Sequence, residues 1–403
     1  MKIIYLHQYF KTPEMAGGTR SYEMARRMVA AGHDVHIVTS RTEASPHRNW
    51  LVENIDGINV HYYPVPYSNK MGFYRRMFSF IKFSFFSTKK TISLKGDVVF
   101  ATSTPLTIAI PGVLASKFNK IPFVFEVRDL WPEIPVAMGV IKNSILKKMA
   151  FWLARWAYEN SKKIVALSDG MKDGIVAHGV PDEKVSVISN GSDLELFDPK
   201  VKHDSYLLKK IPAVRGRKIV VYTGTFGAVN GVDYMVSLAA ESKKAGYSHC
   251  FVAIGAGAFF SKARDLAESE GVLNSNFWIF PEISKMDIVR VLSECDVSMS
   301  LVVNNPVLFA NSANKIFDAL AAGKPIIINY GGWQADLIDK YDVGLVLDCF
   351  KYDVAARELH NFLTSASRLR QSSINARLLA ERDYSRDCLA NKLISLLEGV
   401  VAS

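Results

Sequence analysis

Cysteine is scarce in this sequence, and its spacing suggests neither a disulfide framework nor a metal site. The 403 residues include four cysteines, which lie singly at positions 250, 295, 349 and 388. Isolated cysteines are typical of reduced, structural side chains in a cytoplasmic protein. The nine histidines contain no pair four residues apart, and no Asp-x-Asp element follows a strand-like run, so we expect no bound metal.

Long apolar runs are also missing, as is a leader-like beginning. The most apolar long segment, residues 98–118, is interrupted by two prolines, a lysine and several hydroxyl side chains, which argues against a membrane-spanning helix. The chain enters a strand-like run at Lys2 with no charged and apolar regions before it, so we expect no signal peptide. The absence of a G-x-S-x-G elbow and of a Walker lysine argues against esterases and P-loop ATPases.

Length and hydrophobic patterning predict two α/β domains. A chain of 403 residues exceeds what one hydrophobic core usually supports. In the first half, helix-like segments at 19–31, 144–160 and 169–178 lie between apolar, strand-like segments, which is the order of a parallel sheet. These predicted strands are residues 2–7, 35–40, 58–63, 97–101, 122–127, 163–167 and 185–189.

The same pattern restarts after a polar stretch. Residues 191–217 contain Pro199 and Pro212, and we predict the interdomain linker there. The second set of predicted strands is residues 218–223, 250–255, 276–280, 296–301, 324–329 and 344–347. The closing segment, residues 372–400, is helical in pattern. Two doubly wound halves imply a cleft between them, with the ligand at the carboxyl ends of the strands.

The net charge of +10 is concentrated in one aromatic segment. Residues 1–195 carry 25 Lys and Arg against 17 Asp and Glu, whereas residues 196–403 carry 24 against 22. Within the first half, residues 67–90 hold six basic residues, eight aromatic residues and no acid. Such a segment suits a membrane interface. A core-facing amphipathic helix with a solvated basic rim and a nucleic-acid surface remain alternatives, although no nucleic-acid motif accompanies the charge.

Residues 311–328 predict a short helix followed by a buried strand. Asn311 and Ser312 are residue types that cap a helix, and Gly323 is a favoured helix end. Lys315 lies in the expected first turn and shares a helix face with Asp318. A cation and free backbone N–H groups suit a diphosphate, and a carboxylate suits ribose hydroxyls. A capped helix with a solvated Lys–Asp pair is the alternative.

Glycine-rich loops follow the first strand of each half. Gly17 and Gly18 precede the first helix, and residues 224–231 occupy the equivalent place in the second half. Glycines there let backbone amides approach a phosphate, although ordinary turns also use them. Residues 254–257 form a comparable loop after the next strand. The glycines at 224, 227 and 231 miss the G-x-G-x-x-G spacing, which makes a dinucleotide site less attractive.

Charged residues also gather after the strand predicted at residues 122–127. Residues 126–133 contain three acids and an arginine, and Trp131 among them suits stacking on a sugar ring. An ion-pair cluster with a structural role is the alternative.

Together these residues resemble the retaining glycosyltransferases of family 4 with the GT-B fold. The resemblance implies an α/β architecture of two Rossmann-like, doubly wound domains facing a central cleft, at residues 1–195 and 217–383. A final helix near residues 384–403 would cross back onto the first domain. The features that carry the resemblance span nearly the whole chain: GGTR at 17–20, RDLWPE at 128–133, SNGSD at 189–193, YTGTFGAVNG at 222–231, IGAG at 254–257 and NKIFDALAAGKPII at 314–327.

The resemblance also implies roles for individual residues. Thr225 and Lys315 would face the donor diphosphate, and Asp318 would take the place of the family's ribose-binding glutamate. Ile283 would lie at the nucleobase, and Gly17 and Gly18 at the donor phosphates and sugar. The implied catalytic set is Arg128, Asp129, Glu133 and Lys315, and the implied substrate-binding set is Gly17, Gly18, Arg20, Thr225, Ile283, Asn314, Lys315 and Asp318.

Three positions depart from the family's pattern. The first glutamate of its E-x7-E pair is Ala310, eight residues before Asp318. Arg128 stands where the family often has a histidine, and residues 224–231 lack the arginine or lysine that many relatives carry there. Binding of the negatively charged phosphates would therefore depend more on Lys315 and on helix N-termini.

The form of RDLWPE resembles bacterial O-antigen N-acetylfucosamine transferases. It implies transfer of N-acetyl-L-fucosamine or a related sugar from a UDP-linked donor to a saccharide on undecaprenyl diphosphate. The enzyme would act at the cytoplasmic face of the inner membrane without metal or cofactor, and it would not bind nucleic acid. A GT-B nucleotide-sugar epimerase and a non-enzymatic nucleotide- or sugar-binding protein are the alternatives.

Overall fold

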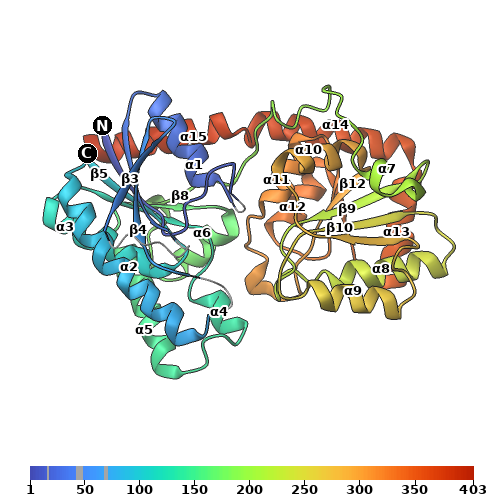
Figure 1. Ribbon diagram of the computed structural model, residues 1–403, viewed down its shortest axis with the longest axis horizontal. Helices are drawn as coiled ribbons and strands as arrows, with labels where there is room; N and C mark the ends of the chain where they lie inside the picture. Colours follow the sequence, from blue (N-terminus) through green and yellow to red (C-terminus); the bar gives the residue numbers. More distant parts are fainter. Residues whose placement is uncertain (16–17, 42–48, 68–70) are drawn as a thin grey trace. The chain divides into compact units, whose positions relative to one another are not determined.

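The computed structural model describes residues 1–15, 18–41, 49–67 and 71–403, and these residues form two compact units (Figure 1). The first unit comprises Met1–Ser189, Ala310–Ser312 and Asp387–Ser403, and the second comprises Asn190–Phe309 and Ala313–Arg386. Each unit contains a sheet of mainly or wholly parallel strands covered by helices, which confirms the predicted α/β class.

The strands of the first unit form one sheet in the order β3-β4-β2-β1-β5-β6-β7-β8 among the described residues. Its elements are β1 (Lys2–Leu6), α1 (Arg20–Ala30), β2 (Asp34–Arg41), β3 (Leu51–Ile55), β4 (Ile58–Pro64), α2 (Phe73–Leu94), β5 (Val98–Thr102), α3 (Ala109–Asn119), β6 (Phe123–Val127), α4 (Glu133–Ala137), α5 (Ser144–Asn160), β7 (Lys163–Ala166), α6 (Asp169–Val176), β8 (Val185–Val187) and α15 (Arg386–Ala402). The strand β3 was not predicted from the sequence. It is an antiparallel edge strand whose side chains are alternately exposed and half-buried. With so little burial, its hydrophobic signal is weak.

Alternation along these strands sends side chains to two separate cores. Ile4 and Leu6 of β1 face a core that contains residues of α2, α3, α5 and α6. Ile3 and Tyr5 of the same strand face a second core, which contains residues of α1 and of α15. A strand buried on both faces reads as a continuous apolar run, which is why the first strand was predictable.

The second unit holds a six-stranded parallel sheet in the order β11-β10-β9-β12-β13-β14 among the described residues. Its elements are α7 (Leu207–Lys210), β9 (Ile219–Thr223), α8 (Asp233–Lys244), β10 (Cys250–Ile254), α9 (Phe260–Ser269), β11 (Phe277–Phe280), α10 (Lys285–Glu294), β12 (Val297–Ser300), α11 (Asn314–Ala321), β13 (Ile326–Ile328), α12 (Trp333–Tyr341), β14 (Gly344–Val346), α13 (Tyr352–Thr364) and α14 (Ala366–Asp383). The strand order reverses between β9 and β12, so the loop after β9 lies where ligands bind in sheets of this type.

The closing helical segment consists of two helices, α14 and α15. The backbone leaves the helix at Tyr384, where α14 ends, and α15 begins at Arg386. Between them Ser385 forms an isolated bridge with Ser192, and the backbone N–H of Ser192 donates to the carbonyl of Tyr384. None of the helices in the described parts of the chain combines the length and apolar character needed to cross a membrane.

Candidate functional site

Lys315 lies in the first turn of α11, in the second unit. Its Nζ lies 3.8 Å from the centroid of the Tyr222 ring, at the end of β9. Among the described residues it has no carboxylate partner. Burial of its amino group lowers its pKa to about 7. A cation without a counter-ion, held at the start of a helix, is suited to accept an anion.

The helix around Lys315 starts later than the cap residues predicted. Its N-cap is Ala313, which cannot supply a side-chain hydrogen bond, so the expected capping by Asn311 or Ser312 is wrong. Asn314 is the first helical residue. The N–H groups of the first turn therefore have no side-chain cap from the N-cap position, which favours an external acceptor.

The loop after β9 makes close contacts at two glycines, Gly224 with a side chain and Gly255 with backbone. A Cβ on Gly224 would lie 2.7 Å from Nζ of Lys315, and one on Gly255 would lie 1.7 Å from the carbonyl oxygen of Gly224. The N–H of Gly224 donates to the carbonyl of Ile254, and the hydroxyl of Tyr222 donates to the carbonyl of Thr225 at 2.7 Å. Thr225 itself is exposed. The glycines thus bring two loops and the lysine together at the carboxyl ends of β9 and β10.

Asp318 is buried and both of its oxygens already accept hydrogen bonds. Ser192 donates to Oδ1 at 2.9 Å, and Lys285 lies 2.5 Å from Oδ2. Asp318 thus pairs with Lys285, which differs from the solvated Lys315–Asp318 pair considered above. Lys285 starts α10, two residues after the half-buried Ile283. The structure therefore brings the β11–α10 loop to the helix that carries Lys315.

Arg128 and Asp129 follow β6 in the first unit. The backbone N–H of Arg128 donates to Oγ of Ser103 at 3.0 Å, and its guanidinium lies 3.4 Å from Nε2 of His7. Burial raises the pKa of Asp129 to about 6, although Arg128 opposes the rise. A carboxyl that titrates near neutral pH at the end of a strand is a common feature of active sites.

Arg20 is buried in a network with Glu126. Its guanidinium donates to Oε1 of Glu126 at 2.8 and 3.0 Å and to the carbonyls of Ile188 and Ser189 at 2.9 and 2.6 Å. Thr102 donates to the other carboxylate oxygen of Glu126 at 2.6 Å. Burial opposes ionisation of Glu126, yet the charge and hydrogen bonds of Arg20 keep its pKa below the ordinary value. These contacts commit Arg20 to holding the ends of β6 and β8.

The remaining predicted residues of this unit are Glu133, Gly18 and Gly17. Glu133 at the start of α4 lies 2.6 Å from Nε2 of His178. Gly18 is exposed just before α1. Gly17 lies outside the described residues.

His7 and Gln8, directly after β1, were not predicted as site residues from the sequence. Both side chains are almost completely buried, at 3% and 1% exposure. Nδ1 of His7 and both polar atoms of the Gln8 amide lack a hydrogen-bond partner among the described residues. Buried polar groups normally have hydrogen-bond partners, so a polar group of a ligand could supply the missing partners of these atoms. The sequence feature that could have identified them is a pair of polar residues directly after an apolar strand.

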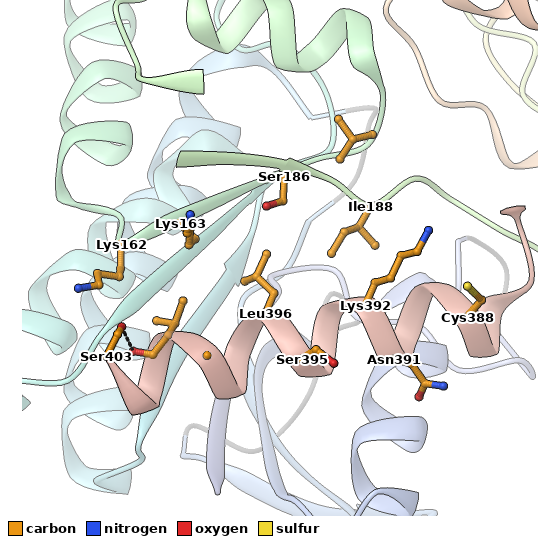
Figure 2. Close-up of a pocket in the computed structure, with 13 residues that line it drawn as sticks. Lys162, Lys163, Ser186, Ile188, Cys388, Asn391, Lys392, Ser395, Leu396 and Ser403 are labelled. Carbon is orange, nitrogen blue, oxygen red and sulfur yellow. Dashed lines mark hydrogen bonds between the residues drawn. The ribbon is translucent and has the colours of Figure 1, made fainter. Parts of the chain in front are cut away.

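A groove lies elsewhere in the first unit, away from the predicted site residues. Figure 2 shows this groove of about 1130 Å³ between the edge strand β8 and α15. None of the predicted site residues is among the residues that line it: Lys162, Lys163, Ser186, Val187, Ile188, Cys388, Asn391, Lys392, Ser395, Leu396, Gly399, Val400 and Ser403. This groove is therefore separate from the residues that the sequence predicts for the functional site.

Two family models match consecutive parts of the chain. Residues 16–191 match the glycosyl transferase 4-like domain, and residues 207–379 match the glycosyl transferases group 1 model. Both names agree with the family resemblance of the motifs, and together the two matches leave only the ends and a short connection of the chain outside them.

Known proteins support the same assignment. The probable glycosyltransferase WbjE of Pseudomonas aeruginosa is 25% identical over 267 residues, which are 64% of this chain and 64% of that protein. The crystal structure of Anabaena HepE in complex with UDP and glucose has a TM-score of 0.72 at 15% identity and covers 99% of this chain and 100% of its own. That of WaaG, a glycosyltransferase involved in lipopolysaccharide biosynthesis, has a TM-score of 0.71 at 16% identity, with 98% and 100% covered. These structures show the GT-B fold.

Proposed function

Because the chain belongs to the GT-B glycosyltransferases, we propose that it transfers a sugar from a UDP-linked donor to a lipid-linked saccharide, with retention of anomeric configuration. The observation that carries the proposal is Lys315, a cation without a carboxylate partner among the described residues, at the start of a helix and beside a glycine loop. A UDP ligand in HepE supports UDP as the donor nucleotide. The name of WaaG and the RDLWPE motif support a role in O-antigen or capsule synthesis.

In the proposed donor site, Lys315 and the first-turn N–H groups of α11, which begins at Asn314, hold the diphosphate. Thr225 lies beside the diphosphate on the exposed side of the loop, and Ile283 contacts the nucleobase. Asp318 receives the ribose hydroxyls while it keeps its ion pair with Lys285. The glycine contacts at 224 and 255 hold this loop in place before the donor arrives, and such preorganisation lowers the cost of binding.

In the proposed reaction, the acceptor hydroxyl attacks the anomeric carbon on the face from which UDP departs. The bond between that carbon and the diphosphate oxygen breaks, and the hydroxyl proton passes to the departing diphosphate. Lys315 stabilises the charge that develops on the diphosphate. In the first unit, Asp129 accepts the hydrogen bond of the acceptor hydroxyl and Arg128 binds the donor sugar or phosphate. Gly18 approaches the donor, Arg20 positions strand ends through Glu126, and Glu133 supports its loop through His178.

A thermal-shift panel of UDP, GDP, TDP, CMP and NAD with EDTA tests the donor site. A ligand that binds only the native state raises its stability, so we expect a shift with UDP that persists in EDTA. No shift with any nucleoside diphosphate would contradict the proposal. A shift with UDP that vanishes in EDTA would contradict metal independence.

The variant Lys315→Ala tests the catalytic role. We expect its turnover to fall roughly 100- to 1000-fold, since it loses one donor to the leaving group. Lys340→Ala is the matched control, because Lys340 also lies over a tyrosine ring, that of Tyr341, but is exposed on α12. Turnover of Lys315→Ala close to that of the control would refute the assignment.

The proposed acceptor requires the enzyme to reach a bilayer, and the basic, aromatic residues 67–90 are the proposed contact. The double variant Arg75→Gln and Arg76→Gln should bind anionic vesicles more weakly, because each cation near an anionic surface contributes about 1 kcal/mol. Unchanged vesicle binding by this variant would remove these residues from the proposal.

A further inference from the structure

Three helices lie side by side on one face of the sheet in the first unit (Figure 1). Helix α2 packs against α3, and α3 packs against α5. All three contribute side chains to the same core beneath them, including Phe83 of α2, Val113 of α3 and Tyr158 of α5. Their outer faces therefore form one layer that points away from the sheet.

Helix α2 exposes aromatic side chains and buries hydroxyls. Tyr74, Phe78, Ile81 and Phe85 are 87%, 67%, 59% and 55% exposed, and their spacing of four, three and four residues puts them on one helix face. The inward face instead contains buried Ser79, Ser84, Ser87 and Thr91 beside Phe83. A helix that served only the core would place its aromatic residues inward. The exposed apolar stripe of α2 is therefore suited to bind a partner surface.

Helix α5 repeats the arrangement. Ile145, Met149 and Trp152 are 66%, 59% and 63% exposed and again lie four and three residues apart. Between α2 and α5, helix α3 exposes Leu114 and Phe118, four residues apart. Three neighbouring helices thus each present an apolar stripe on their outer side, whereas scattered exposed hydrophobic residues would show no such spacing.

The charges around these stripes have one sign. Helices α2, α3 and α5 contain five, one and three basic residues and a single acid, Glu159. That acid is paired with Arg155 at 2.8 Å. On α2, Nζ of Lys89 lies 4.4 Å from the ring centroid of Phe85, so cations border the aromatic side chains directly. A surface of this composition is complementary to anionic lipid headgroups above an apolar layer.

We propose that α2, α3 and α5 form one surface that docks on an anionic lipid bilayer, with the apolar stripe of α5 inserted as well as that of α2. The inference deepens the proposed function, since a lipid-linked acceptor requires such docking, and it adds two helices that lie outside residues 67–90. Trp152 is the main anchor on α5, because indole rings favour the membrane interface. Lys147 and Lys148 on the same helix contact headgroups.

Vesicle cosedimentation of the full chain tests the contribution of α5. The probe is phosphatidylcholine vesicles with about a third phosphatidylglycerol. The double variant Met149→Ser and Trp152→Ser should bind about tenfold more weakly, because two exposed apolar side chains no longer enter the bilayer. The matched control is Met286→Ser and Phe350→Ser, which removes side chains of 52% and 72% exposure from the second unit and should bind as the unaltered protein does. All four positions are exposed, so we expect both double variants to fold.

Tryptophan fluorescence reports the insertion itself. The spectrum should shift to the blue on vesicle addition, and Trp152→Phe should lose most of that shift while it still binds. Equal binding by the α5 variant and its control, equal binding to purely zwitterionic vesicles, or a spectrum that does not change would each overturn the inference. So would a stable dimer that the α5 variant dissociates, since a second copy would then cover the surface.

The UDP thermal shift separates this inference from the proposed function. We expect the α5 variant to keep the full shift with UDP, because the residues proposed to hold UDP itself lie in the second unit: Thr225, Ile283, Lys315 and Asp318. An unaltered protein that responds to UDP but ignores anionic vesicles refutes the docking surface and leaves the donor site standing. Vesicle binding without any nucleotide response refutes the proposed function instead.

Discussion

Raising the pH from 7 to 9 should weaken UDP binding through a single side chain. Burial lowers the pKa of Lys315 to about 7 in the free protein, so its amino group is about half charged at pH 7 and about one-tenth charged at pH 8. A bound diphosphate favours the charged form and raises the pKa again. The apparent dissociation constant should therefore rise about fivefold from pH 7 to pH 8 and about tenfold more by pH 9.

The sign follows from proton linkage. The complex binds more protons than the free protein above pH 7, so each step upward in pH favours the free protein. The assay is isothermal titration calorimetry of UDP in buffers of different ionisation enthalpy. Binding should take up about half a proton at pH 7 and about nine-tenths at pH 8.

Two variants control this experiment. Lys340→Ala should keep the full pH dependence, because Lys340 is exposed over the ring of Tyr341. Lys315→Ala should bind UDP weakly and with no proton uptake above pH 7. If the unaltered protein bound UDP equally well at pH 7 and pH 9, the assignment of Lys315 to the diphosphate would fail.

Three further predictions concern stability and are checked by urea denaturation. Gly255→Ala should cost about 3 kcal/mol because its Cβ would clash with backbone, whereas Gly246→Ala, which has a positive φ but open space, should cost about 1 kcal/mol. Glu126→Gln should cost about 3 to 5 kcal/mol since it leaves a buried guanidinium without its charge partner, against less than about 0.5 kcal/mol for the exposed Glu159→Gln. Burial, helped by neighbouring His360, lowers the pKa of His249 to about 4. The unfolded chain, with a pKa of about 6.5 at this histidine, therefore binds a proton that the folded protein does not, and the stability of the folded state falls as the pH drops below about 6.5. Lowering the pH from 7 to 5 should cost about 2 kcal/mol of stability at this ring, and His249→Gln should not show that loss. Equal costs within either matched pair, or the same acid response with and without the imidazole, would contradict the reasoning.

The order of elements was predictable because both sheets are buried on two faces. Strands such as β9 and β13 read as continuous apolar runs, and the glycine loop and Lys315 follow from their position relative to those runs. The helix predicted at residues 144–160 is α5, Ser144–Asn160, and in the structure the side chain of Asn143 caps its first turn.

Partners were not predictable, since they come from distant parts of the chain. The acidic run at 126–133 looked like one site, yet Glu126 pairs with Arg20 and Glu133 with His178. In the same way Asp318 pairs with Lys285 on another helix. Sequence periodicity locates a strand end, but the identity of the side chain across from it depends on how the strands are ordered in the sheet.

The face that α2 buries was hidden for a related reason. Its period shows an apolar stripe and a hydroxyl stripe, and hydrophobicity alone would turn the apolar stripe inward. The structure buries the hydroxyls of Ser84 and Ser87, which donate to backbone carbonyls of α2 and of its neighbours. Small side chains whose hydroxyls are hydrogen-bonded allow close helix packing at little cost in free energy. Which face of α2 is buried therefore depends on its packing against α3, which the sequence of α2 alone does not show.

Helix α15 gives the first unit an unusual order of assembly. Its side chains Leu389, Leu393 and Leu397 complete the core that also contains Ile3 and Tyr5 of β1. The ribosome makes these helix residues only after the whole of the second unit. Until they emerge, only α1 of the two helices α1 and α15 covers this core, so the part of the core's apolar surface that α15 buries stays exposed on the nascent chain. Removing residues 387–403 should therefore damage the earliest part of the protein, and a stalled nascent chain should be a favoured substrate for chaperones.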